Sequence, residues 1–179
     1  MNKDAVIARG ADWVQRFVIG LNLCPFAKRV VAAGQLGWRV SEATDSEDAY
    51  QDFLRCLDDF MQADEPETLL FVMPDAVAEF DAYLDLLAQC EWALGEAGLN
   101  GEVQLASFHP DYRFDGVEAN DPANYTNRSP WPMLHLLRHA SIERATAAYP
   151  DPEKIPERNC QLLRDMGENA IQRLLKESC

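Results

Sequence analysis

The sequence lacks a hydrophobic run long enough to cross a membrane. A membrane-spanning helix needs about 20 consecutive apolar residues, and no stretch of this 179-residue chain approaches that length. The N-terminus also lacks the basic and then apolar segments that are typical of a secretory signal. We therefore expect a cytoplasmic protein that makes no use of a membrane.

Closely spaced cysteines are lacking as well. The chain has five cysteines, an odd number, and no two of them form a C-x-x-C pair. This pattern excludes a disulfide framework and a zinc ribbon. We expect most of these thiols to be reduced and structural: Cys24, Cys56, Cys90, Cys160 and Cys179.

Basic residues are almost missing from the middle of the chain. Between Ser41 and Glu102 there are seventeen acidic residues and one basic residue, Arg55, so the net charge of this segment is −16. The rest of the chain has a net charge of +2, which gives the total of −14. Such an acidic segment repels phosphate backbones, which argues against a nucleic-acid partner.

Acids are missing in turn from the stretch between Trp13 and Ser41, which holds Arg16, Lys28, Arg29 and Arg39. If the protein binds a small anionic molecule, the flanks of the acidic segment are the places where we expect the site. We assign no cofactor and no oligomeric state.

The order of expected elements indicates an α/β protein. Helical periodicity, short apolar runs and turn residues alternate along the chain. This order predicts a single domain over 1–179 with a small, mostly parallel sheet, flanking helices and extra helices at both termini. The expected helices are 4–22, a short one after Pro25, 45–64, 75–99, 131–149 and 156–178, and the expected strands are 37–43, 67–74 and 101–110.

His109 stands at the carboxyl end of an expected strand and is followed by Asp111 and Tyr112. Open α/β sheets bind ligands at such strand ends, so His109 is a candidate general base or acid, with Asp111 and Tyr112 beside the substrate. The alternative is that His109 caps the strand end by a hydrogen bond to a nearby carbonyl.

His135 and His139 are four residues apart, which places them on one face of the expected helix 131–149. Two such histidines could hold a metal ion with His109 as a third ligand. However, the segment lacks the glutamate of the zinc-protease pattern, and we assign no metal site.

The segment TNRSP, residues 126–130, is typical of the start of a helix. Free backbone N–H groups there, together with Asn127, Arg128 and Ser129, could bind an anion. A plain helix cap with Arg128 on the surface is the alternative.

Cys24 begins the string CPFAKR, at or just before an expected helix. The helix dipole, Lys28 and Arg29 would lower the pKa of the thiol and favour the thiolate. The string resembles the active-site start of omega-class glutathione transferases and glutaredoxins, which implies a thiolate that attacks a mixed disulfide with glutathione. The segment before Cys24 is expected to be a helix, unlike the strand of that fold.

Four strings together, LNLCPFAKR, ETLLFVMP, VQLASFHPDYRF and TNRSPWPMLHLLR, resemble the signatures of an uncharacterised bacterial family, the domain of unknown function fourteen-fifteen. Their order and spacing cover nearly the whole chain. The resemblance implies a compact domain and brings no established activity.

The leading hypothesis is a small enzyme that acts on a small anionic molecule by thiol-dependent transfer or redox chemistry. Cys24 would be the nucleophile, His109 the base or acid, and the binding residues would be Arg29, Asp111, Tyr112, Asn127, Arg128, Ser129 and His135. One alternative is a metal-dependent hydrolase that uses His109 and His135. Another is a non-enzymatic binding or assembly protein that docks a partner through Phe114, Tyr125 and Trp131.

Overall fold

The computed structural model describes residues 2–147 and 149–176, and its centre is a four-stranded mixed sheet. The strand order is β1 (Leu36–Val40), β2 (Thr68–Val72), β4 (Met133–Arg138) and β3 (Val103–Phe108). β1 and β2 are parallel, whereas β4 runs antiparallel to both of its neighbours. The predicted α/β class is confirmed, and the expectation of a mostly parallel sheet is wrong.

β4 is the reason for that difference, because it lies within the segment that was expected to be helix 131–149. Leu134 and Leu136 face one side of the sheet and Met133 faces the other, and all three are fully buried. A strand covered on both faces is apolar at successive positions and loses the alternation that identifies strands. The helix in this region, α5 (His139–Thr146), begins only at the second histidine.

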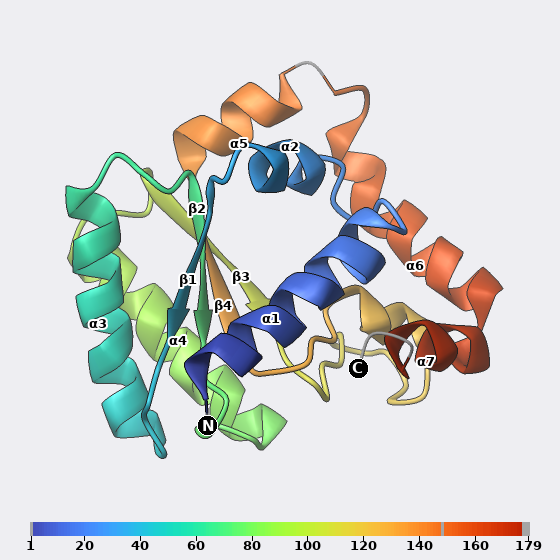
Figure 1. Ribbon diagram of the computed structural model, residues 1–179, viewed down its shortest axis with the longest axis horizontal. Helices are drawn as coiled ribbons and strands as arrows, with labels where there is room; N and C mark the ends of the chain where they lie inside the picture. Colours follow the sequence, from blue (N-terminus) through green and yellow to red (C-terminus); the bar gives the residue numbers. More distant parts are fainter. Residues whose placement is uncertain (1, 148, 177–179) are drawn as a thin grey trace.

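One face of the sheet is covered by α3 (Ser46–Gln62) and α4 (Phe80–Glu96), as Figure 1 shows. The sequence offers Asp45 or Ser46 as the cap of α3, and the structure selects Asp45, whose carboxylate accepts the backbone N–H of Asp48 at 2.9 Å. α4 begins five residues later than expected, after a turn in which Val77 has a φ of 47°. Phe53, Phe71 and Tyr83 lie in the core between these helices and the sheet.

The other face is covered by α1 (Lys3–Trp13), a following π-helical segment (Val14–Ile19) and the C-terminal helices α6 (Ile155–Met166) and α7 (Glu168–Lys176). α1 lies against β1 because Gly10 has no side chain. A Cβ at Gly10 would lie 2.6 Å from the ring of Trp38. The expected helix 156–178 is divided at Gly167, whose φ is 72°.

The short helix α2 (Ala27–Ala32) follows Pro25 as expected, and it lies beside α5 at one end of the sheet (Figure 1). The expected strands 37–43, 67–74 and 101–110 correspond to β1, β2 and β3. Within the part of the chain that the structure describes, no helix is long and apolar enough to span a membrane.

Candidate functional site

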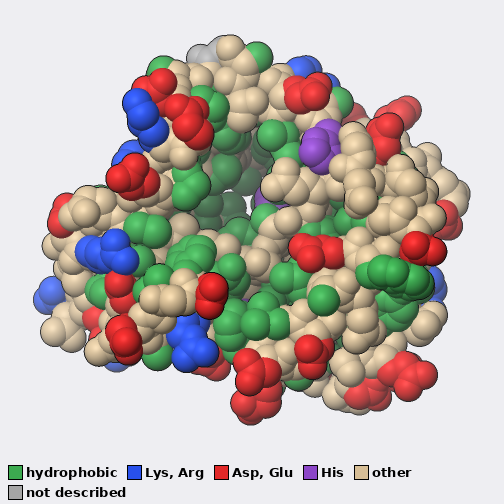
Figure 2. Space-filling view, turned by 180° about the vertical axis from the view of Figure 1, so that it is seen from behind, with side chains coloured by type: hydrophobic (Ala, Val, Ile, Leu, Met, Phe, Trp, Pro, Cys, Tyr) green, Lys and Arg blue, Asp and Glu red, His purple; other side chains and the backbone are tan. Residues whose placement is uncertain are grey.

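A pocket of about 330 Å³ lies on the sheet face between the π-helical segment, α2 and α5. Its floor consists of side chains from the sheet, among them Thr68, Ala106 and His135. Its walls carry Cys24 and Arg29 from the α2 region and further residues of α5. Hydrophobic side chains line a hollow in the molecule seen from behind in Figure 2. Three predicted residues from two segments of the chain, Cys24 and Arg29 from CPFAKR and His135 from β4, thus line one pocket.

His135 lies on the pocket floor with one ring nitrogen bound and one free. Nε2 is hydrogen-bonded to the Thr68 hydroxyl, and that hydroxyl in turn donates to the Leu136 carbonyl at 3.0 Å. A hydroxyl has one proton, so both contacts are satisfied when Nε2 carries the proton and donates to Thr68. Nδ1 is then a hydrogen-bond acceptor that has no protein partner among the described residues.

Burial lowers the pKa of His135 to about 4. The ring is therefore neutral at neutral pH. A neutral ring with a bare Nδ1 can accept a hydrogen bond from a ligand or take up its proton.

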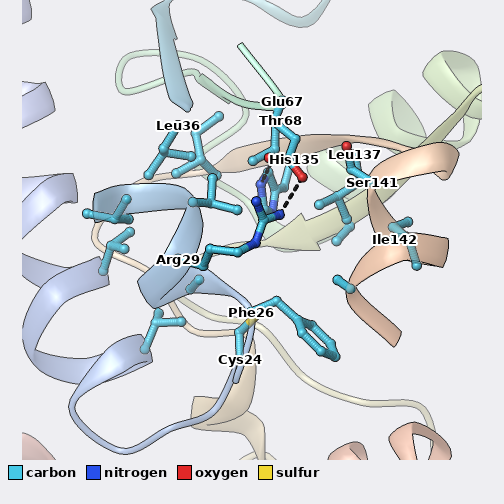
Figure 3. Close-up of a pocket in the computed structure, with 18 of the residues that line it drawn as sticks. Cys24, Phe26, Arg29, Leu36, Glu67, Thr68, His135, Leu137, Ser141 and Ile142 are labelled. Atoms are coloured by element: carbon cyan, nitrogen blue, oxygen red, sulfur yellow. Dashed lines mark hydrogen bonds and ion pairs between the residues drawn. The ribbon is translucent and has the colours of Figure 1, made fainter. Parts of the chain in front are cut away.

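Arg29 reaches from α2 toward Glu67, as Figure 3 shows, and donates to its carboxylate at 2.5 Å. Arg144 of α5 lies 3.6 Å from the same oxygen. Hydrogen bonds from Arg29 and Ser141 hold the pKa of Glu67 below its usual range. Two cations and one carboxylate leave this end of the pocket with a net positive charge.

Cys24 lies near Phe26 at the opposite end of the pocket from Glu67 (Figure 3). Burial raises the pKa of the Cys24 thiol, and this outweighs the hydrogen bonds from the backbone of Phe26 and Ala27. The predicted lowering of this pKa by the helix dipole, Lys28 and Arg29 is therefore wrong. Arg29 is turned to Glu67, and α2 begins only at Ala27, so the thiol is a neutral group in an apolar wall.

His109 lies outside this pocket and is fully buried. Its Nε2 donates to the Val77 carbonyl at 3.2 Å, and its Nδ1 accepts the backbone N–H of Asp111 at 3.0 Å. Because the backbone occupies both nitrogens, the ring has no atom that a ligand can reach. The geometry favours the alternative in which His109 anchors the strand end.

Arg128 lies in the loop before β4, and no helix begins there. The expectation of a helix start at TNRSP is wrong, because Pro122–Thr126 forms a 3₁₀ turn that ends at Thr126. Arg128 donates to the carbonyls of Tyr112 and Ala119 at 3.1 and 2.8 Å. No helical N–H groups are available there for an anion.

The other residues predicted in this region hold the loop together. Asn127 donates to the Ser107 carbonyl at 2.9 Å, and Ser129 donates to the Trp131 carbonyl at 2.6 Å. The ring of Tyr112 packs against Phe80 and Phe114. Asp111, Asn127, Arg128 and Ser129, like His109 and Tyr112, do not line the pocket of Cys24 and His135.

The paired-histidine metal site has no geometric basis, since His135 belongs to β4 and His139 to α5. No group of three His, Cys, Asp or Glu side chains within residues 2–147 and 149–176 could hold a metal ion. The metal-dependent hydrolase alternative therefore has no ligand set there.

The aromatic docking surface of the assembly alternative is not formed either. Tyr125 is 9% exposed, and Phe114 and Trp131 are only partly exposed. These three rings do not form a jointly exposed patch.

The sequence did not point to Thr68, Glu67 or Ser141 as pocket residues. Thr68 and Glu67 stand at the start of an apolar strand, where a polar residue is usual. Thr68 could have been found only through its partner, because it lies 67 residues from His135.

The fold and the site define a class: an α/β protein with a mixed four-stranded sheet and an apolar pocket on one face. The family model described as "Protein of unknown function (DUF1415)" matches residues 5–173. The chain belongs to this family, as its four signature strings predicted. No curated protein and no solved structure matches the chain.

Proposed function

We propose that the pocket of Cys24, Arg29 and His135 binds a small, largely apolar molecule that carries one anionic group and one hydrogen-bond donor. The observation that carries this proposal is the free Nδ1 of His135 on the floor of an otherwise apolar pocket. This nitrogen is not closed off from solvent, so a ligand can reach it and use it as a hydrogen-bond acceptor.

The size and lining of the pocket support a small organic ligand. Binding pockets are mainly apolar, enclose about 300–1,000 Å³ and hold a few polar groups that orient the ligand. At about 330 Å³ this pocket is at the lower end of that range. It therefore fits a compact ligand about the size of a substituted ring.

The charges at the mouth favour an anionic group on that ligand. Arg29 and Arg144 share the single carboxylate of Glu67, so one positive charge is left over. The side chain of Arg29 is 57% exposed, so its remaining N–H donors can bind a ligand carboxylate without breaking the ion pair.

A set of matched probes tests this proposal. 4-Hydroxybenzoate carries both groups, whereas benzoate and phenol each carry one. Ligand-detected NMR should show 4-hydroxybenzoate binding several-fold more tightly than either. Arg29→Gln should weaken the binding of 4-hydroxybenzoate and benzoate, which carry a carboxylate, and should leave the binding of phenol unchanged.

A filled pocket provides the control. Ala106→Leu places a larger side chain on the pocket floor and should abolish binding, whereas Ala140→Leu, exposed on α5, should preserve it. Equal binding by the two variants, or no binding of any probe to the wild-type protein at millimolar concentration, would overturn the proposal.

A second candidate function is thiol chemistry at Cys24, and the observation that favours it is the position of this thiol in the same pocket wall. Cys24 Sγ would attack one sulfur of a disulfide ligand: a new S–S bond forms to Cys24, the S–S bond of the ligand breaks, and the leaving sulfur takes up the proton that the Cys24 thiol gives up. Burial raises the pKa of this thiol, so it must lose its proton in the course of the attack.

Alkylation of the native protein tests the second candidate. Iodoacetamide should modify Cys24 faster than Cys56 or Cys90, which are fully buried and whose pKa values burial also raises. Saturating 4-hydroxybenzoate should protect Cys24. If the three thiols react at the same rate, thiol chemistry at Cys24 has no support.

A further inference from the structure

A second pocket, of about 180 Å³, lies on the other side of Trp13 from the first. Arg9 of α1 and Arg128 of the loop before β4 both line it, with Tyr125, Ser129 and Leu175. Two arginines thus meet at one small pocket of a chain whose net charge is −14.

Neither arginine has a carboxylate partner among the described residues. Arg128 makes two hydrogen bonds to neutral carbonyls, and Arg9 makes no side-chain hydrogen bond to any residue that the structure describes. Asp12, one turn along α1 from Arg9, is paired instead with Arg16 at 2.7 Å. Within residues 2–147 and 149–176, neither guanidinium is therefore held in an ion pair, although Arg128 also borders a pocket lined by Glu79, Asp81 and Asp111.

Aromatic rings hold both guanidinium groups in place. Arg9 lies 5.0 Å from the centre of the Trp131 ring, and Arg128 lies 4.7 Å from the centre of the Tyr125 ring. Stacking uses the face of a guanidinium and leaves the N–H donors at its edge free to bind an anion.

The surroundings also contain donors that lack acceptors. The indole N–H groups of Trp13 and Trp131 are buried and have no hydrogen-bond partner in the described part of the chain. Trp13 is 4% exposed and lines the pocket. An indole N–H can only donate, so Trp13 brings a donor without a partner to the pocket wall; Oδ2 of the neighbouring Asp12 is a buried acceptor that also lacks a partner among the described residues.

We infer that this second pocket binds a compact oxyanion, the phosphate or carboxylate group of a small molecule. The pocket is large enough for one such group and a short apolar part beside Leu175. The site is independent of the first pocket, and it gives Arg128 an anion-binding role that needs no helix start.

Intrinsic tryptophan fluorescence tests this inference, because Trp13 lines the pocket and the ring of Trp131 contacts Arg9. Inorganic phosphate and acetate are titrated into the full-length protein at constant, low ionic strength, with chloride as the reference. A saturable change with either oxyanion supports the site, and the tighter of the two identifies the group. No saturable change with either would overturn the inference.

Variants locate the binding. Arg9→Gln removes an exposed side chain with no hydrogen bond and should weaken binding at least fivefold. Arg55→Gln makes the same charge change on α3, far from the site, and should leave binding unchanged. Equal losses in both variants would show an effect of net charge alone and would overturn the inference. Ala106→Leu should bind the oxyanion normally, so this site and the first pocket can fail separately.

Discussion

Thr68 and His135 form the polar centre of an otherwise apolar pocket floor, and each depends on the other. Thr68 is 5% exposed and is the sole acceptor for Nε2 of His135 among the described residues. Without the hydroxyl, the ring would lose the contact that sets its tautomer, and its Nδ1 would no longer be presented to a ligand in a defined state.

Thr68→Val should therefore lower the free energy of unfolding. Valine keeps the shape of threonine but leaves a buried donor unsatisfied, which costs about 1–3 kcal/mol. Urea unfolding of the variant measures this. Thr44→Val, at an exposed position, should change stability by less than about 0.5 kcal/mol. Equal effects of the two substitutions would show that the Thr68–His135 contact contributes nothing.

His135 should also make stability depend on pH. Its pKa is about 4 in the folded protein and about 6.5 when unfolded. The unfolded chain binds the extra proton between these values, so stability is full above pH 6.5 and is lost as the pH falls toward 4. The loss attributable to His135 should be about 3 kcal/mol.

His135→Gln isolates this effect. The difference in unfolding free energy between the wild-type protein and the variant should decrease between pH 7 and pH 4. Parallel pH profiles would contradict the account. NMR titration of the wild-type imidazole gives an independent check, since the ring should stay neutral until the pH approaches 4.

At the scale of elements, the close contact between α1 and β1 depends on Gly10. Alanine is the better helix former by about 1 kcal/mol, but its Cβ would overlap the Trp38 ring. Such overpacking costs about 1–3 kcal/mol. Gly10→Ala should therefore lower the thermal midpoint.

Two controls accompany this prediction. Gly101→Ala meets no atom within 4 Å and should have little effect. Trp38→Leu removes the ring atoms that the new Cβ would meet, so Gly10→Ala should cost less in that background. A cost that is the same with and without Trp38 would show that the contact is not responsible.

The elements that the sequence predicted well are those with one solvent-facing side. α3 has a buried stripe of Phe53, Leu57 and Phe60 opposite acidic residues, so its periodicity predicted the helix and limited its cap to Asp45 or Ser46. β4 was missed because it is the second central strand, covered on both faces, and MLHLLR has the composition of a buried helix.

The sequence predicted some of the residues that belong to the candidate site, but it did not predict how they are arranged in space. Cys24 and Arg29 belong to one short string, whereas His135 is more than 100 residues away, and it reaches them because β4 lies antiparallel beside β2. The same misassigned strand explains why Arg128 and the paired histidines were placed on a helix. Arg29 is turned toward the carboxylate of Glu67, which is distant in the sequence, and backbone groups bind both ring nitrogens of His109. No local sequence pattern reveals these partners.

At the scale of the whole molecule, charge is divided across the sheet. α3 and α4 belong to the acidic segment and cover one face, whereas the pocket opens on the other face. This arrangement agrees with an anion site outside the acidic helices. It also means that the exposed carboxylates of α3 and α4 repel one another.

Salt should therefore stabilise the protein. Raising NaCl from about 0.01 M to 0.15 M shortens the screening length from about 30 Å to about 8 Å, which weakens this repulsion. The urea midpoint should rise. The rise should be smaller after Asp85, Glu91 and Glu96, all exposed on α4, are replaced by their amides. A fall in the midpoint with salt would show that attractive pairs dominate.

The central claim, that the pocket of Cys24, Arg29 and His135 binds a small molecule, is tested most directly by a crystal structure of the protein with 4-hydroxybenzoate. We predict density for the ligand on the sheet face, with its hydroxyl within hydrogen-bond distance of His135 Nδ1 and its carboxylate beside Arg29. Ligand bound elsewhere, or a pocket that holds only water at a saturating concentration, would contradict the account.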